Sequence, residues 1–195
     1  MKSAAKLRSL LAIALLVTPL VSWAAFPSVV QQGDATLKLN GEGVRYRLMF
    51  KVYKMALYTP SPAATPDQLL SMPGPKRIAF EALRELPGTN LGLAFIKGLS
   101  ANSPRDMVQK HVTSTNRLIE IFSGRAKLLP GDSFAMEYLP GKGTQFYILN
   151  EPQGAPVGDE EFFRMVLRIW VGPSPADHQL KERLLAESEA ASRRQ

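Results

Sequence analysis

The 195-residue chain contains no cysteine and only two histidines, His111 and His178. Without cysteine there is no disulfide framework, no thiol nucleophile and no thiolate metal site. The two histidines lack metal-ligand spacing, and no nucleophile-elbow motif accompanies either of them as the base of a triad. We therefore expect no catalytic constellation, no metal and no cofactor. His111 falls on an apolar helical stripe and is predicted to pack in the core.

Long hydrophobic runs are equally scarce. The one at the N-terminus, Leu10–Val21, follows three cations and precedes the small-x-small motif Ser22-Trp23-Ala24. It is shorter than the roughly 20 residues that span a bilayer, and its flanks are typical of a secretory signal peptide. We expect cleavage near Ala25 and a periplasmic protein; an uncleaved membrane anchor is the alternative. No later stretch is predicted to span a membrane.

The charge balance is mildly basic. The formal net charge is +7, and removing the three leader cations leaves 24 − 3 = 21 Lys and Arg against 17 acids, or about +4. This excess is too small for the basic stripe of a nucleic-acid-binding protein, so no nucleic-acid partner is expected. It suits an anionic small molecule or a lipid surface. The sequence identifies no protein partner.

The central stretch, Leu39–Tyr58, has no proline and continues a Gly-x-Gly into strand-forming sequence. The Gly-x-Gly lacks the third glycine and following helix of a dinucleotide-binding loop. It instead predicts a bend or bulge. One alternating set of residues, running from Val44 to Tyr58, is apolar except at Lys54 and is predicted to face the core. The other set mixes Arg45, Arg47 and Lys51 with Met and Tyr; it suits either a wet ligand cleft or a solvated face of snorkelling cations.

Strand and helix patterns continue along a single predicted domain, residues 26–186, before a tail at 187–195 that is expected to be disordered. Strands are predicted at 35–40, 44–58, 76–83, 132–139 and 144–150. Helices are predicted at 66–72, 91–99, 103–122 with Ser103 as N-cap, 158–171, and from Ser174 to about Leu185. This order predicts an α+β fold, with an antiparallel sheet and helices packed on one face.

Two segments of the chain resemble a known family. Gly41-Glu42-Gly43-Val44-Arg45, the following Phe50-Lys51-Val52-Tyr53 and the Leu57-Tyr58 strand end are similar to the chalcone isomerase family, in particular to its bacterial exported branch. The segment Phe162–Leu185 resembles the same family's helix–Gly–Ser-Pro–helix ending. The similarity extends over residues 34–185. It implies an open-faced β-sandwich with a ligand cleft between the sheet and the helices.

The resemblance can be followed residue by residue. The arginine that faces the oxyanion in chalcone isomerases matches Arg45. The family's water-ordering Thr and Tyr fall on Tyr53 and Leu91, its Asn falls on Gly98, and its Ser or Thr falls near Phe163. Leucine and glycine cannot order a water or polarise a carbonyl, so the resemblance supports no catalytic residues.

The remaining arginine and tyrosine resemble the family's non-catalytic fatty-acid-binding members. These use Arg and Tyr to hold a carboxylate at one end of an apolar cavity. The resemblance therefore implies a site formed by Arg45, Tyr53 and Leu91, with Phe95 and Phe163 expected beside the ligand's tail. An arginine offers a charge-assisted, bidentate grip and a tyrosine adds one donor.

Three functions remain open. The leading one is a non-catalytic, exported binding protein for a fatty acid or similar amphipathic anion; the others are an isomerase-like enzyme with replaced chemistry and a structural or partner-binding domain whose cleft is filled. The geometry also remains open. In one straight strand, Arg45 and Tyr53 would lie about 26 Å apart at 3.3 Å per residue. They can share a ligand only if the chain turns between Tyr46 and Phe50, where no glycine marks a turn.

Overall fold

The computed structural model describes residues 26–185. The predicted leader, 1–25, and the predicted tail, 187–195, lie outside this range. Among the described residues no helix is long and apolar enough to cross a bilayer.

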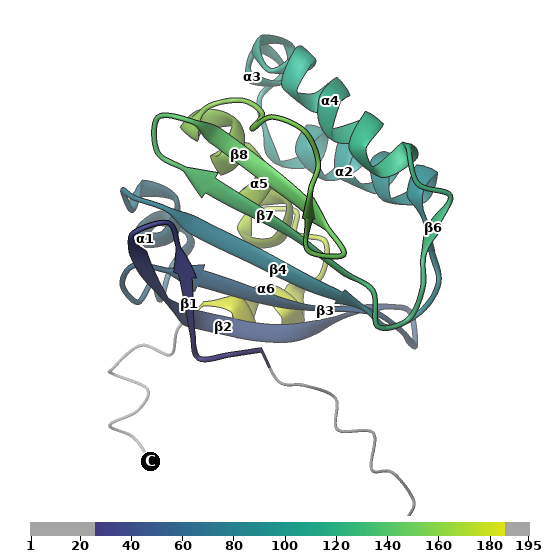
Figure 1. Cartoon of the computed structure of the whole chain (residues 1–195), viewed down its shortest axis with the longest axis horizontal. Helices are drawn as coiled ribbons and strands as arrows, with labels where there is room; N and C mark the ends of the chain where they lie inside the picture. The colour runs from purple at the N-terminus through teal and green to yellow at the C-terminus, as the bar shows by residue number, and fades with distance from the viewer. Residues whose placement is uncertain (1–25, 186–195) are drawn as a thin grey trace, which may run out of the picture.

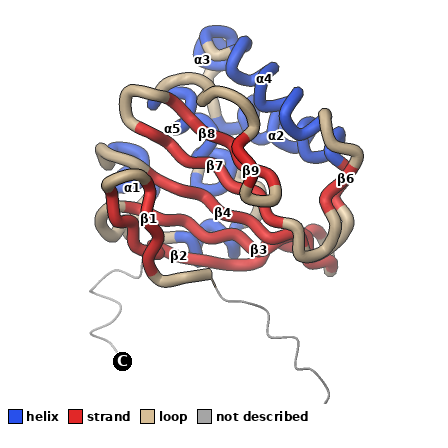
Figure 2. The backbone as a smooth tube through the Cα atoms, viewed as in Figure 1, coloured by secondary structure: helices blue, strands red, loops and turns tan. Residues whose placement is uncertain are grey.

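The central element is a curled, seven-stranded antiparallel sheet (Figure 1). Its spatial order is β1 (Val29–Gln32), β2 (Ala35–Arg47), β3 (Phe50–Thr59), β4 (Lys76–Ala82), β7 (Ser133–Leu139), β8 (Gly143–Ile148) and β9 (Glu151–Pro152). A two-stranded ribbon, β5 (Leu86–Pro87) with β6 (Lys127–Leu128), lies apart from it. The helices gather on one side of the sheet (Figure 2), so the predicted α+β architecture is confirmed.

The stretch predicted as one long strand is a hairpin. β2 ends at Arg47, β3 begins at Phe50, and the two are antiparallel neighbours joined by the two-residue turn Leu48–Met49. Leu48 has φ +57°, a left-handed backbone that costs an L-residue about 1–2 kcal/mol. Two-residue hairpin turns usually place Gly, Asn or Asp in such a conformation, and because Leu48-Met49 has none of these residues the turn could not be predicted from sequence.

The glycine pair acts inside β2 rather than ending a strand at Asn40. The register with β3 shifts between Leu39 and Gly41, so the predicted bulge is present. A Cβ at Gly41 would overlap the carbonyl oxygen of Arg183, because helix α6 (His178–Leu184) packs directly on β2 here. The first strand of the sheet also comes earlier than predicted, at β1.

The helices follow the sequence with three corrections. They are α1 (Pro66–Ser71), α2 (Gly88–Asn102), α3 (Arg105–Lys110), α4 (Val112–Ser123), α5 (Glu160–Val171) and α6. The helix predicted over 103–122 is broken at His111, whose φ is −102° and ψ 22°. Ser103 does not cap it, since its hydroxyl is buried without a partner. The last helix begins not at Ser174 but at His178, where the Asp177 side chain caps Leu180 N.

The main core lies between the sheet and α5, and Val52, from the set predicted to face the core, joins it. From Tyr53 onward, however, the core uses the face of β3 opposite to the one predicted. Tyr53, Met55 and Leu57 face the helices. Ala56 and Tyr58, from the predicted core set, pack in a smaller cluster on the outer face of the sheet. The apolar residues near the turn, including Phe50, remain exposed. The choice of face was wrong because both sets of β3 are apolar enough to be buried.

Candidate ligand-binding cleft

A cleft of about 590 Å³ lies between the hairpin end of β2–β3 and helix α2. This volume is within the range of roughly 300–1,000 Å³ that small-molecule sites occupy. Residues from the hairpin form one wall and residues 90–101 of α2 the other. The C-terminal end of α5 and the segment 174–176 that follows it complete the lining. Several lining positions on α2 are exposed, so the cleft is an open groove rather than a closed cavity.

The hairpin brings Arg45 and Tyr53 together. They are directly paired across β2 and β3, and the Arg45 guanidinium carbon lies 5.5 Å from the centre of the Tyr53 ring. Both residues line the cleft, as does Leu91 from α2. The turn at Leu48–Met49 thus removes the 26 Å separation of a straight strand. All three residues predicted for the site lie in one cleft.

The Tyr53 hydroxyl is oriented by a residue that the sequence did not reveal. It accepts a hydrogen bond from Trp170 Nε1 at 2.8 Å, which leaves its own proton available for donation toward an acceptor. Burial raises the pKa of Tyr53, opposed by the nearby Arg45 cation and the Trp170 hydrogen bond, so the hydroxyl stays protonated. One signal in the sequence pointed to this contact: Trp170 lies on a helix predicted to be buried, and a buried indole N–H needs a hydrogen-bond acceptor.

Arg45 has unused hydrogen-bonding capacity. Its Nε is buried and has no hydrogen-bond partner. Leaving a buried donor of a charged group unpaired is unfavourable, and an anion in the cleft would pair it.

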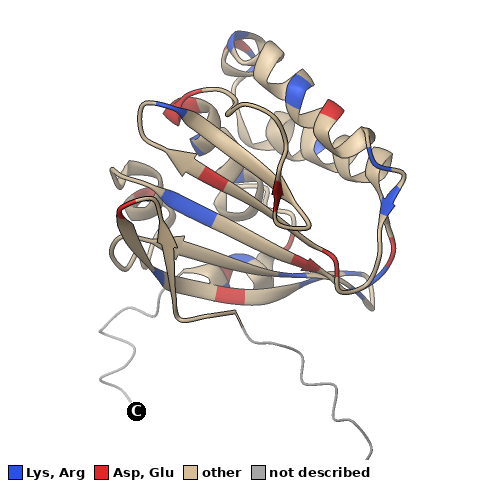
Figure 3. Cartoon of the chain, in the orientation of Figure 1, with Lys and Arg blue, Asp and Glu red and all other residues tan. Residues whose placement is uncertain are grey.

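The cleft is locally cationic. Arg47 and Lys97 join Arg45 in its lining, and no Asp or Glu is among the described residues that line it. Asp177 is close enough to act on the pKa of Tyr53, but its carboxylate accepts from the backbone of Tyr46 and of Leu180. Over the molecule as a whole, Lys and Arg are interspersed with Asp and Glu (Figure 3). The excess of positive charge is therefore a property of the cleft.

The floor of the cleft is aromatic and well packed. Phe95 and Trp170 meet at 5.8 Å between ring centres, and Phe80 stacks on Phe134 at 4.2 Å. Phe95 lines the cleft as expected for a residue beside a ligand tail. Phe163 does not: it stacks on Tyr138 in the core, outside the lining. That part of the prediction is wrong because Phe163 lies near the start of α5, about two helical turns before Trp170, which lines the cleft.

Gly98 has a packing role. A Cβ at this position would lie 2.8 Å from Ile169 Cγ2, so glycine allows α2 to approach α5 closely. The polar side chain that the family resemblance places here would not fit beside Ile169. At Gly98 the cleft therefore lacks the amide side chain that chalcone isomerases carry at the matching position in the family resemblance.

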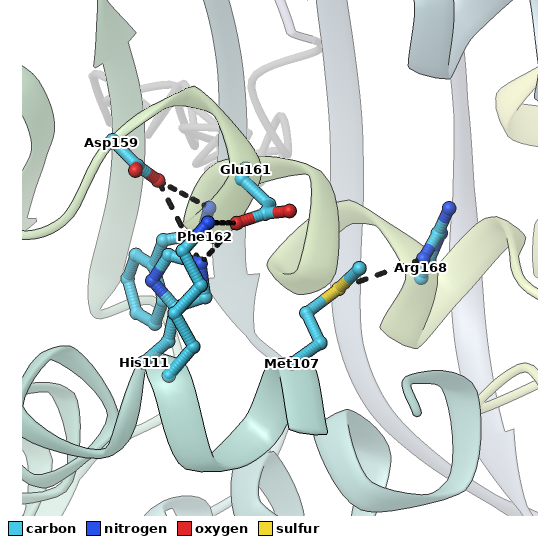
Figure 4. A network of polar contacts seen from close by, with 7 residues as sticks. Met107, His111, Asp159, Glu161, Phe162 and Arg168 are labelled. Atoms are coloured by element: carbon cyan, nitrogen blue, oxygen red, sulfur yellow. Dashed lines mark hydrogen bonds and ion pairs between the residues drawn. The ribbon is translucent and has the colours of Figure 1, made fainter. Parts of the chain in front are cut away.

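A second polar cluster lies away from the cleft, where α5 begins (Figure 4). His111 Nε2 is 2.9 Å from Glu161 Oε2 and 3.9 Å from Asp159 Oδ1. Glu161 also pairs with Lys110, and the hydrogen bonds from Lys110 and His111 lower the pKa of Glu161 to about 2. His111 is buried, as predicted, but its ring Nε2 is held in a hydrogen bond with Glu161.

Among the described residues, His111, Asp159 and Glu161 form the group whose ligand atoms are close enough to hold a metal ion. Each is accounted for without one. Asp159 Oδ1 accepts from Phe162 N at 2.9 Å as the helix cap, and the Glu161 carboxylate is shared by His111 and Lys110. The cluster joins the α3–α4 break to the start of α5.

The comparisons with known proteins agree with this fold. A crystal structure of a fatty-acid binding protein from Arabidopsis thaliana superposes with a TM-score of 0.63 and 17% identity, over 82% of this chain and 90% of that chain. At this identity the likeness establishes the fold alone. No curated protein matches the sequence. The family model described as chalcone isomerase-like matches residues 21–186. The chain therefore belongs to the chalcone isomerase-like family.

Proposed function

We propose that this protein is a non-catalytic binding protein for a fatty acid or a similar amphipathic anion. The observation that carries the proposal is the pairing of Arg45 with Tyr53 inside the cleft, with Arg45 Nε buried and unpartnered. A carboxylate at this point would accept from Arg45 and from the Tyr53 hydroxyl. Tyr53 is already held in place through Trp170. The solved fatty-acid binding protein of the same fold supports this choice of ligand class.

The rest of the cleft suits the remainder of such a ligand. Beyond Arg45, the wall contributed by α2 offers Leu91 and Phe95, and the small residues Ala94 and Gly98 line the cleft beside them. Their apolar surface would cover a hydrocarbon chain. Lys97 and Arg47 add positive charge at the rim, which favours anions over neutral lipids.

The test is a titration of delipidated protein lacking residues 1–25 with medium- and long-chain fatty acids. Trp23 lies in the predicted leader, so Trp170 is then the one tryptophan, and its fluorescence reports on Tyr53 and the cleft. Calorimetry gives the affinity. We expect saturable binding that Arg45→Ala weakens by about 1.5–3 kcal/mol, roughly ten- to a hundredfold.

Two controls separate a carboxylate site from diffuse electrostatics. Arg45→Lys keeps the charge but loses the fork geometry, and should bind at an intermediate level. Arg105→Ala removes one exposed charge at the start of α3, at a position that does not line the cleft, and should bind as the parent does. Arg47 is unsuitable for this purpose because it lines the same cleft. Equal losses from Arg45→Ala and Arg105→Ala would contradict the proposal.

A structural role is the second candidate, and the aromatic floor favours it. Phe80, Phe95, Phe134 and Trp170 fill the space between the sheet and α2 with ring contacts of 4.2–5.8 Å. If the remaining groove is too shallow for a ligand, no fatty acid will change the Trp170 fluorescence or the melting temperature. That result would favour the second candidate, a partner-binding domain whose cleft is filled by its own side chains.

We also propose that the protein is exported to the periplasm as a member of the family's bacterial exported branch. The cations, apolar run and small-x-small motif of residues 1–25 support this, with 26–186 as the mature domain and 187–195 as its tail. N-terminal sequencing of the periplasmic protein should find a start near Ala25. Recovery of intact Met1 from that fraction would contradict the assignment.

A further inference from the structure

The β2–β3 hairpin ends in an exposed apolar tip. Leu48 is 90% exposed, Met49 88% and Phe50 63%. Leu48 and Met49 form the turn beyond the sheet, and Phe50 is the first residue of β3, paired with Arg47. Exposed apolar residues that stand singly are ordinary, whereas a contiguous exposed group marks a surface that contacts something apolar.

Cations surround this tip. Arg47 precedes it, Lys51 follows it, and Arg84 lies over the Phe50 ring with its guanidinium carbon 5.7 Å from the ring centre. The segment 45–51 contains no acid. The nearby Glu85 is bound to Lys127 Nζ at 2.8 Å. Apolar side chains at the apex with cations behind them match the order of layers in a membrane surface, where acyl chains lie beneath anionic headgroups.

The backbone of the tip points to a requirement for leucine. Leu48 has φ +57°, a conformation that glycine or asparagine adopts with less strain. Fold stability alone would favour one of those residues at a two-residue turn. An apolar side chain held here, almost fully exposed and in a strained conformation, is explained by a contact that the free protein does not make.

We propose that the hairpin tip docks the protein onto a bilayer containing anionic phospholipid. Leu48 and Met49 insert at the headgroup boundary, and Lys51 and Arg84 bind the headgroups. The cleft opens beside the tip, since Arg47 and the exposed Leu93 both line it. Docking would hold the open cleft against the lipid surface. The inference concerns binding to the bilayer and does not rest on the identity of the ligand in the cleft.

The experiment is co-sedimentation of protein lacking residues 1–25 with vesicles of phosphatidylcholine, alone or mixed with phosphatidylglycerol. We expect binding to the mixed vesicles that weakens as salt is added. Leu48→Asn/Met49→Ser should reduce the partition coefficient by about tenfold or more, since it removes the inserted apolar surface. Lys51→Gln/Arg84→Gln should reduce it by about fivefold for each cation removed.

The controls exclude misfolding and bulk charge. Asn tolerates the left-handed backbone, so Leu48→Asn/Met49→Ser should melt no lower than the parent. Val112→Asn and Arg105→Gln change exposed positions on α4 and α3, outside the hairpin, and should leave vesicle binding unchanged. Fatty-acid binding in solution should also survive Leu48→Asn/Met49→Ser, which separates this inference from the proposed function.

Three results would overturn the inference. The first is no binding of the parent protein to vesicles containing phosphatidylglycerol. The second is vesicle binding that is unchanged in both Leu48→Asn/Met49→Ser and Lys51→Gln/Arg84→Gln. The third is a dimer in solution that Leu48→Asn/Met49→Ser dissociates, because the tip would then be covered by a second copy of the chain.

Discussion

Tyr53→Phe and Tyr58→Phe make the same chemical change on the same strand, and the structure predicts different outcomes. Both side chains are almost fully buried. The Tyr53 hydroxyl accepts from Trp170 Nε1, whereas the Tyr58 hydroxyl has no hydrogen-bond partner. Removing the first hydroxyl leaves a buried indole N–H unpaired. Removing the second hydroxyl eliminates a polar atom that was already unpaired.

The magnitudes follow from the energetics of buried donors. An N–H left without an acceptor costs about 1–3 kcal/mol, so Tyr53→Phe should lower the free energy of unfolding by that amount. For a domain of this size roughly 2–4 °C accompanies each kcal/mol, which gives a loss of roughly 2–12 °C in melting temperature. The Arg45–ring contact survives in Phe, so it does not contribute. Tyr58→Phe should be neutral or slightly stabilising.

Urea unfolding followed by circular dichroism measures both variants against the parent. The single variant Trp170→Phe and the double variant Tyr53→Phe/Trp170→Phe complete a double-mutant cycle, which measures the coupling between the two side chains. If Tyr53→Phe and Tyr58→Phe differ by less than about 0.5 kcal/mol, the hydrogen bond carries none of the stability assigned to it.

Three further predictions concern other parts of the chain. Gly98→Asn should destabilise the fold by about 1–3 kcal/mol in thermal unfolding, because its Cβ would meet Ile169 and force α2 from α5. Because the pKa of Glu161 is lowered, its contribution to the free energy of unfolding is present at pH above 4.5, the ordinary pKa, and is lost as the pH falls toward about 2. Glu161→Gln should therefore make the free energy of unfolding depend less on pH over that range. Chalcone cyclisation should proceed at the spontaneous rate, and a saturable acceleration that Arg45→Ala abolishes would restore the enzyme hypothesis.

The elements whose local chemistry is unambiguous could be predicted from sequence. Thr65 caps α1 with a complete capping box, Gly124 ends α4, and Asp159 caps α5. These boundaries are set by contacts within a few residues, so the sequence contains the information. The hairpin β7–β8 was found for the same reason, around Pro140 and its neighbouring glycines.

The elements that were missed depend on tertiary contacts. Leu48 takes the turn conformation of a glycine, and no local signal announces that. The break at His111 coincides with its hydrogen bond to Glu161, 50 residues away in the chain. The residues of the site were predicted, but not their geometry. Arg45 and Tyr53 were identified from the sequence, whereas their adjacency depends on the turn at Leu48–Met49. The role of Trp170 depends on how α5 packs against the sheet.

The path between β4 and β7 has a consequence for how this fold can diversify. These strands are neighbours in the sheet, yet 50 residues separate Ala82 from Ser133. The residues between them form an insertion whose two ends lie next to each other at the same end of the strand pair. Ala82 N donates to Asp132 O at 2.9 Å and Gly131 N donates to Ala82 O at 2.8 Å. Backbone hydrogen bonds therefore join the two ends of this insertion. Helix α2 can therefore lengthen, shorten or change its side chains without altering strand register. Arg45 and Tyr53 belong to the β2–β3 hairpin, and the cleft wall that faces them belongs to this insertion. The insertion is therefore the natural place to engineer the size of the cleft without changing the hairpin.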